Sequence, residues 1–333
     1  MGVSKLQQDL FEAIRRNIPD HLSATEEIAK VLDVSVDSVY RRMRGEKTIS
    51  LDELHKLCTH YKISSDQLMN LQTGAFLFQG TSLNNKTFRF EDYLKGMVRD
   101  LSYMNSFKNK EIFYLCKDVP IFTHYYFREI AAFKYFFWMK TIFHFPEFEQ
   151  QRFSFDFYPD ESKALGEKAL ALYNQLPSTE FWNVENINFA IRQIEFYRDS
   201  RMFESENDVL RLYEAWEKVI DHVERQAERG YKFNYNDPEQ KPINTYRVYF
   251  NEVILGDNSF IVLLEGVKMA VISYTVVNYM TTRDLSFCEN MFDYVQSLMK
   301  RSTLISKVSE KERSKFFRIL RERIARRKDT LKV

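Results

Sequence analysis

Helix-breaking residues are rare in this chain. Its 333 residues include only 9 Gly and 7 Pro, the two residue types that most strongly interrupt helices. Apolar residues instead recur at helical spacing, as Leu6, Leu10, Ile14 and Ile18 do in the first segment. The sequence therefore predicts a mainly α-helical protein with long helices and few loops.

Changes in pattern along the chain predict four regions. Residues 1–72 contain five short amphipathic segments, which predict a five-helix domain. Residues 73–90 lose this periodicity and predict a linker. Residues 91–235 carry longer amphipathic helices, which we expect to form a helical dimerisation or sensor region. Residues 236–333 predict a small α+β C-terminal region that ends in a basic helix.

Three β-like runs lie in the last region. They cover residues 245–255, 260–265 and 267–277, and turn residues separate them. Because short turns join antiparallel neighbours, the runs predict a three-stranded antiparallel meander. The polar residues that follow, within 273–287, fit either a ligand pocket or ordinary strand ends.

Capping signals mark the helix starts in the first domain. Ser23, Ser50 and Ser64 each precede a Glu or Gln by three residues, a spacing that predicts a capping box. Ser35 is predicted to cap the next helix without a capping box. Asp33 lies at the turn before Ser35, and Asp tolerates the left-handed backbone that such a turn requires.

The segment EEIAKVLDVSVDSVYRRMRG, residues 26–45, carries the most specific pattern. Ala29 is small where two helices must cross closely, and a turn follows before the next helix. Residues 22–70 resemble the Cro/C1-type helix-turn-helix, also called xenobiotic-response-element-like. The resemblance implies a DNA-binding domain whose second helix, residues 36–44, enters the major groove.

Helical geometry divides the residues of this second helix. At 100° per residue Val39 and Met43 face the core, whereas the opposite arc holds the side chains of a reading face. Chemistry and the resemblance together predict four base-contacting residues: Val36, Asp37, Tyr40 and Arg41. Five residues are predicted to contact phosphates: Thr25, Ser35, Arg42, Arg44 and Lys47.

The predicted function is a sequence-specific, double-stranded DNA-binding transcriptional regulator of a bacterium. Such proteins usually bind two half-sites as dimers, so the rest of the chain is expected to form a homodimer and to sense an unidentified small-molecule or peptide effector. Two alternatives remain: a protein-interaction scaffold whose helix-turn-helix binds no DNA, and an enzyme with a site in the C-terminal half. The chain shows no nucleotide-binding or hydrolase motif, and we expect no enzyme activity and no cofactor.

Other features argue against a metal, a membrane span or a secreted protein. His55 and His60 diverge from Cys58 on a helix, so no metal site is expected. The apolar stretch 130–140 is interrupted by Lys134 and is too short to cross a bilayer. Three scattered Cys predict no disulfide framework. These features favour a cytoplasmic, nucleoid-associated protein without membrane contact.

Two segments allow more than one interpretation. The aromatic block 122–148 fits a hydrophobic core, a ligand groove or a partner interface. Residues 311–328 are strongly basic. They fit either a terminal helix that packs Phe316, Phe317 and Leu320 on the protein, or a second contact with DNA phosphates.

Overall fold

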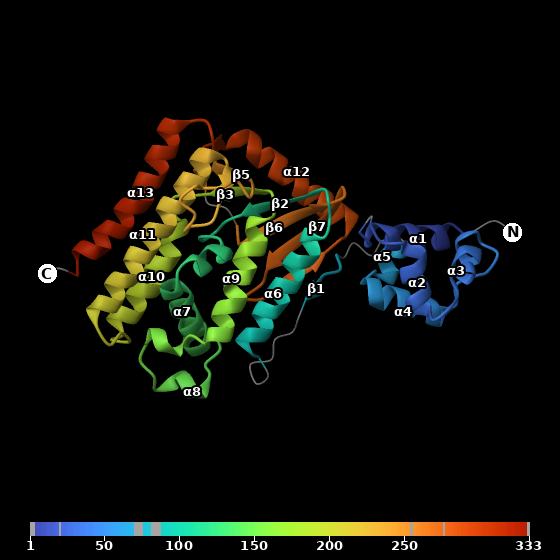
Figure 1. Ribbon diagram of the computed structural model, residues 1–333, viewed down its shortest axis with the longest axis horizontal. Helices are drawn as coiled ribbons and strands as arrows, with labels where there is room; N and C mark the ends of the chain where they lie inside the picture. Colours follow the sequence, from blue (N-terminus) through green and yellow to red (C-terminus); the bar gives the residue numbers. More distant parts are fainter. Residues whose placement is uncertain are drawn as a thin grey trace.

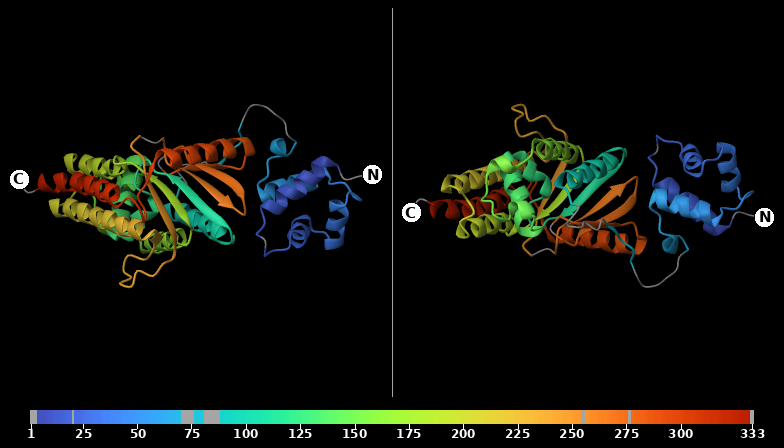
Figure 2. Two further views of the ribbon diagram at one scale, coloured as in Figure 1. Left: turned by 90° about the horizontal axis from the view of Figure 1, so that it is seen from above. Right: turned by 90° about the horizontal axis from the view of Figure 1, so that it is seen from below.

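The computed structural model describes residues 4–19, 21–69, 76–80, 88–253, 256–275 and 277–331. A group of short helices lies at one end of the molecule, and a larger body of helices around a sheet forms the rest (Figure 1). Both views in Figure 2 keep the short helices beside one end of the body, opposite the C-terminus. This arrangement leaves most of the N-terminal surface uncovered.

The N-terminal helices enclose a core of their own. Their bounds are Lys5–Arg16 (α1), Ala24–Leu32 (α2), Val36–Met43 (α3), Leu51–Tyr61 (α4) and Ser65–Leu68 (α5). Leu10, Ile14, Ile28 and Leu57 are almost completely buried in one cluster. Because apolar residues recur every three or four positions, each helix turns one stripe inward. The predicted set of five short helices is present.

The body is built on one mixed sheet. Within the described residues its strands are Gln79–Gly80 (β1), Lys110–Leu115 (β2), Ser178–Trp182 (β3), Tyr231–Lys232 (β4), Asn244–Phe250 (β5), Ser259–Leu264 (β6), Val267–Ser273 (β7), Tyr279–Thr282 (β8) and Thr303–Leu304 (β9). The order across the sheet is β1-β8-β7-β6-β2-β3-β5-β4, and β9 also pairs with β5. Strands β2, β3 and β5 are parallel to one another, and the other pairs are antiparallel. Parallel neighbours need long crossovers, and helices provide them here.

Helices cover both faces of the sheet. Their bounds are Phe90–Asn105 (α6), Arg128–Phe137 (α7), Pro146–Glu149 (α8), Asp160–Asn174 (α9), Asn186–Asp199 (α10), Glu206–Arg229 (α11), Leu285–Arg301 (α12) and Glu310–Asp329 (α13). Two 3₁₀ turns, Ile121–Tyr126 (η1) and Phe155–Phe157 (η3), and one π-helical turn, Trp138–Ile142 (η2), interrupt them. Side chains alternate along β2, so Phe113 and Leu115 pack with α12 while Ile112 and Tyr114 join the large core on the other face. The body therefore has three layers.

The mainly helical class with a β-containing C-terminal region is confirmed, but the strands differ from the prediction. An antiparallel meander exists and consists of β6, β7 and β8. The run 245–255 is not part of it, because β5 pairs with β3 and is separated from β6 by two strands. The segment between β5 and β6 has hairpin-like residues, yet the two strands are not neighbours in the sheet and therefore form no hairpin.

The predicted boundary between residues 235 and 236 does not separate two structural units. Strands β2 and β3 come from the region predicted to be helical, and they lie at the centre of the same sheet as β5 and β6. Both strands are short and buried on both faces, and such runs lack the alternation that marks a strand in sequence. The predicted linker 73–90 lies partly outside the described residues. Its described part includes β1, which pairs with β8.

Most of the aromatic block 122–148 belongs to the core. Ile130, Phe133 and Phe136 of α7 are almost fully buried, which favours the core interpretation for that helix. Within the described residues, none of the helices has the length and apolar character that crossing a bilayer would require.

Candidate nucleic-acid interface

Helices α2 and α3 meet at a tight turn. Asp33 ends α2 with a left-handed backbone at φ 54°, which confirms the expectation for this residue. Ser35 begins α3, and its hydroxyl oxygen accepts a 3.2 Å hydrogen bond from the Ser38 backbone N–H. Ala29 and Val39 are buried in the shared core. The segment therefore folds as a helix-turn-helix.

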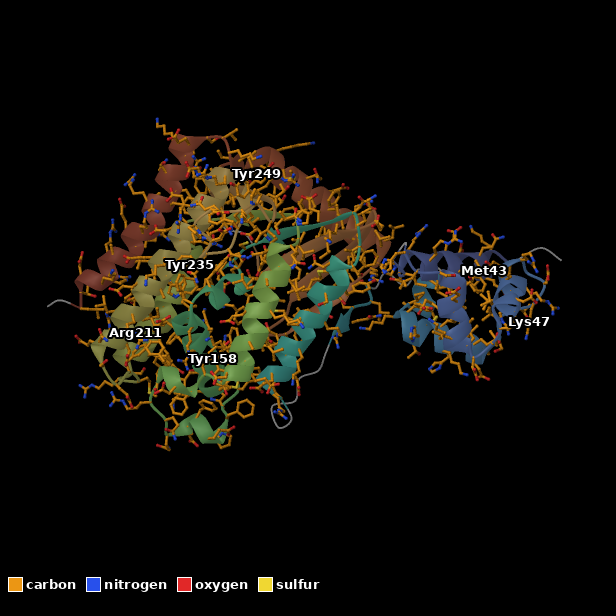
Figure 3. All side chains as sticks on the ribbon, viewed as in Figure 1. Met43, Lys47, Tyr158, Arg211, Tyr235 and Tyr249 are labelled. Atoms are coloured by element: carbon orange, nitrogen blue, oxygen red, sulfur yellow. The ribbon has the colours of Figure 1, made fainter. Side chains whose placement is uncertain are left out.

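The predicted base-contacting side chains share the outer surface of α3. Val36 and Tyr40 are 37% and 46% exposed, the Arg41 side chain is 55% exposed, and Asp37 is also exposed. Figure 3 shows Met43 and Lys47 at the end of the N-terminal helices that points away from the body. A helix exposed on one face at the edge of a molecule can enter a major groove. Contact between these residues and DNA stays a prediction.

Arg42 is not available for the predicted phosphate contact. It is only 1% exposed, and its guanidinium donates to both carboxylate oxygens of Glu53, through Nη2 and through Nε at 3.2 Å. Its Nη1 also donates to the Ser38 carbonyl oxygen at 2.9 Å. Helical spacing placed Arg42 off the outer arc but could not place Glu53 of α4 opposite it. The side chain therefore ties α3 to α4.

Glu53 combines this ion pair with a capping role. Its Oε2 accepts a 3.1 Å hydrogen bond from the Ser50 backbone N–H, and the Ser50 hydroxyl accepts one of 3.1 Å from the Glu53 N–H. The predicted capping box at Ser50 is thus confirmed. The hydrogen bond from Arg42, followed by that from Ser50, holds the pKa of the Glu53 carboxyl below its usual value despite partial burial.

Glu46 forms ion pairs with two of the arginines predicted to contact DNA. The sequence did not predict this role for Glu46. Its carboxylate lies 2.6 Å from Arg44 Nε and 3.6 Å from Arg41 Nε. Hydrogen bonding to Arg44 lowers the pKa of Glu46, so the carboxylate is charged at neutral pH. All three side chains are about half exposed, and solvent weakens such pairs. A DNA phosphate could therefore displace Glu46.

Gln7 holds the loop that follows α3. This buried side chain of α1 donates from Nε2 to the carbonyl oxygens of Arg42 at 2.6 Å and Lys47 at 2.9 Å. Its Oε1 accepts a 3.1 Å hydrogen bond from the Ile49 backbone N–H. These three bonds fix the backbone beneath the exposed Lys47 side chain. The sequence signal that could have identified Gln7 is a polar residue at helical spacing from the apolar residues Leu10 and Ile14.

The remaining predicted phosphate contacts lie at helix starts. Thr25 is half-buried in the first turn of α2, and its hydroxyl lies 3.0 Å from that of Ser23. Ser23 makes no side-chain cap bond, so the capping box predicted there is wrong. Ser35 is exposed at the start of α3. Helix N-termini attract anions, and both phosphate contacts stay predictions.

The basic C-terminal helix packs on the body, as the first of its two interpretations predicted. Phe316, Phe317 and Leu320 of α13 are fully buried. Its charges pair with acids of neighbouring helices; the pairs are Arg321 with Asp221 and Glu224, Arg323 with Glu185, Arg327 with Glu195, and Lys328 with Glu217. The helix also lies at the end of the molecule opposite α3 (Figure 1). A joint contact of α3 and α13 with one DNA site is therefore disfavoured.

Comparisons with known proteins agree with the nature of the N-terminal helices. Residues 8–87 match the family model of the BetR domain, a helix-turn-helix-like family of DNA-binding domains. Neither the curated proteins nor the solved structures contain a significant match to the chain. The match supports a DNA-binding regulatory role, while the narrower assignment to the Cro/C1 type stays a prediction.

Proposed function

We propose that this protein is a sequence-specific transcriptional regulator that binds double-stranded DNA with α3 in the major groove. The observation that carries the proposal is the outer face of α3, where Val36, Asp37, Tyr40 and Arg41 are exposed together on a helix fixed from behind by Arg42 and Glu53. A rigid helix with exposed polar and apolar side chains can read donors, acceptors and thymine methyl groups.

Phosphate contacts supply the rest of the affinity in this proposal. Arg44 and Lys47 are exposed beside the C-terminal end of α3, and Thr25 and Ser35 lie at helix N-termini. Releasing counterions from the DNA backbone is the main source of sequence-independent binding. We expect these residues to set the position of the helix, and the outer face of α3 to choose the sequence.

We further propose that the protein acts as a homodimer in the bacterial cytoplasm, on the nucleoid, and has no enzyme activity. One helix reads only a few base pairs, and dimers of helix-turn-helix proteins bind half-sites about one helical turn apart. The large body is the part of the chain with enough surface to hold two copies together.

Binding-site selection tests the proposal directly. The full-length protein would be incubated with a random duplex library, and bound DNA would be amplified and sequenced over several rounds. We expect enrichment of a two-fold symmetric motif. If the folded protein enriches no sequence and shows no salt-sensitive binding to DNA, the result would favour the alternative of a protein-interaction scaffold.

A further inference from the structure

The body contains a large cavity whose mouth reaches the DNA-binding helices. Its volume is about 880 Å³, within the range of small-molecule sites. Met97, Leu101, Phe122, Phe260 and Met269 are among its lining residues. These come from α6, η1, β6 and β7, so the cavity lies between one face of the sheet and the helices that cover it. Methionine and aromatic side chains make favourable contacts with a planar apolar ligand.

Two opposite charges line the same cavity without pairing with each other. Lys134 of α7 is 4% exposed and donates to Gln193 Oε1 at 2.6 Å. Asp118, which follows β2, accepts a 2.7 Å hydrogen bond from Asn258 Nδ2. Within the described residues, neither side chain forms an ion pair. Each charge therefore has a neutral amide as its hydrogen-bond partner, although the two charges also attract each other without touching and all four residues line one space.

Several side chains that line this cavity also carry buried polar atoms without a hydrogen-bond partner, although these atoms are themselves covered. Trp138 Nε1 and His124 Nδ1 belong to side chains only 3% and 4% exposed, and neither atom has a hydrogen-bond partner among the described residues. Both side chains line the cavity, as do Tyr61, Asn17 and Asn278, which also carry such atoms. An indole N–H can only donate, so Trp138 lacks an acceptor.

The free-energy cost of burying these charged and polar groups indicates which kind of ligand would bind in the cavity. A buried charge or hydrogen-bond donor without its natural partner costs free energy that a complementary ligand recovers. Burial lowers the pKa of Lys134 to about 8, which leaves its ammonium mostly charged at neutral pH. A group with a negative charge suits Lys134, whereas a group with a positive charge suits Asp118.

We propose that the cavity binds a small zwitterion with an aromatic body, of the aromatic α-amino acid class, as the effector of this regulator. Its carboxylate lies toward Lys134, its ammonium lies toward Asp118, and its ring lies among the methionine and aromatic side chains. The cavity is larger than one such molecule because its volume continues into the mouth beside the N-terminal helices.

The mouth of the cavity connects the ligand to the DNA-binding helices. Asn17, after α1, and Tyr61, at the end of α4, line it. The Tyr103 hydroxyl of α6 donates a long hydrogen bond of 3.4 Å to the Asn17 carbonyl oxygen, and Arg283 donates to the same hydroxyl at 3.1 Å. A ligand that moves α6 therefore changes the support of α1 and of the helix-turn-helix behind it.

The linker provides a second connection. Gln79 of β1 donates from Nε2 to the Lys62 carbonyl oxygen at the end of α4, at 2.8 Å. The same residue pairs in the sheet with Thr281 of β8, and Thr281 also lines the cavity. Both interpretations of segment 273–287 therefore apply. Several of its polar residues line the cavity, and some of them also lie in the paired strand β8.

The first test measures ligand binding without DNA. Full-length protein would be titrated by calorimetry with L-tryptophan, L-phenylalanine and L-tyrosine, and then with the deaminated and decarboxylated analogues of the tightest binder. We expect saturable binding of one molecule per chain, weakened about tenfold or more by removal of either charge. No saturable binding of any of the three, as for a cavity that holds only ordered water, overturns the inference. Binding of either analogue as tightly as the parent amino acid overturns the proposed head group.

Two variants assign the charges to their partners. Asp118→Asn should weaken the zwitterion about tenfold but leave the deaminated analogue, which lacks the ammonium, unchanged. Lys134→Met should weaken the zwitterion and leave the decarboxylated analogue unchanged. Asp257→Asn and Lys140→Met make the same chemical changes outside the cavity lining and should bind all ligands like the parent protein. Equal losses for every ligand in the cavity variants would indicate misfolding and overturn the assignment.

The second test measures coupling to DNA, and only this part rests on the proposed function. Operator affinity would be measured by fluorescence anisotropy with and without saturating ligand. We expect a change of about fivefold or more, with the same factor for the effect of DNA on ligand affinity. Ligand binding with unchanged operator affinity overturns the effector role. Ligand binding by a protein that binds no DNA under any condition refutes the proposed function and leaves the ligand site intact.

Discussion

The buried guanidinium of Arg42 in α3 and the partly exposed carboxylate of Glu53 in α4 form an ion pair in which the arginine contacts both carboxylate oxygens. Through this pair, the helix that presents the exposed outer face is tied to the capping box of the next helix. The pair explains why one arginine of the segment RRMR points inward while Arg41 and Arg44 stay about half exposed.

Removal of Arg42 should loosen α3. The variant Arg42→Met keeps the length of the side chain and leaves the partly exposed Glu53 carboxylate without its arginine, at a cost of about 1–2 kcal/mol. We expect faster amide hydrogen exchange in α3 and α4, measured by mass spectrometry on the full-length protein. Arg44→Met is the matched control, because Arg44 pairs only at the surface and should leave exchange nearly unchanged. Equal exchange in the two variants would contradict the structural role of Arg42.

The same pair predicts a loss of stability in acid. The hydrogen bond from Arg42 depresses the pKa of Glu53 in the folded state. Its contribution is therefore fully present above the unfolded-state value of about 4.3 and is lost as the pH falls through the lower folded-state value. We expect the difference in α3 and α4 exchange stability between the parent and Arg42→Met to shrink below about pH 4. A difference that stays constant from pH 7 to pH 3 would show that Glu53 does not supply it.

Arg41 and Arg44 should affect DNA binding in different ways. Arg41→Ala removes a side chain predicted to contact base edges, so preference for a selected site over random DNA should fall about tenfold or more. Arg44→Ala removes a predicted phosphate contact, so affinity for all sequences should fall and the dependence on salt concentration should flatten. Anisotropy titrations at several salt concentrations distinguish the two results. An unchanged sequence preference in Arg41→Ala would place the outer face of α3 outside the groove.

Neutralising Glu46 should strengthen DNA binding. Glu46 pairs with Arg41 and Arg44, and its own charge repels phosphates. In Glu46→Gln both arginines are released, so affinity should rise severalfold for specific and random DNA, most of all at low salt. Glu26→Gln, which changes an exposed acid on α2, serves as the control. A lower affinity in Glu46→Gln would mean that the pairs organise the arginines for DNA instead of competing with it.

Gln7 should control the loop that carries Lys47. Gln7→Met keeps the volume of the side chain but removes the donor to the carbonyl oxygens of Arg42 and Lys47 and the acceptor of the Ile49 N–H, at a cost of about 1 kcal/mol for each hydrogen bond lost. We expect faster exchange in residues 44–50 and weaker binding to all DNA sequences. Gln8→Met, on the exposed side of α1, should change neither property.

The N-terminal helices were predictable because their signals are local. Four-residue apolar spacing, the cap at Ser35 and the turn at Asp33 each act within a few residues, and the structure retains all three, except that Leu6 of the α1 stripe is exposed and Gln7 is buried beside it. The outer face of α3 follows from helical geometry alone, which is why Val36, Tyr40 and Arg41 are exposed as expected.

The sheet and the cavity depended on contacts between distant parts of the chain. Strands β2 and β3 are short and buried on both faces, so their sequences resemble those of buried helices, and only pairing with β5 and β6 makes them strands. Arg42 of α3 pairs with Glu53 of the next helix, and Lys134 of α7 shares a cavity with Asp118, which follows β2. The sequence by itself determined the N-terminal helices, the caps at Ser35 and Ser50, and the exposed face of α3. Tertiary packing decided which charges are buried, which are paired and which line the cavity, since these properties depend on neighbours far apart in sequence.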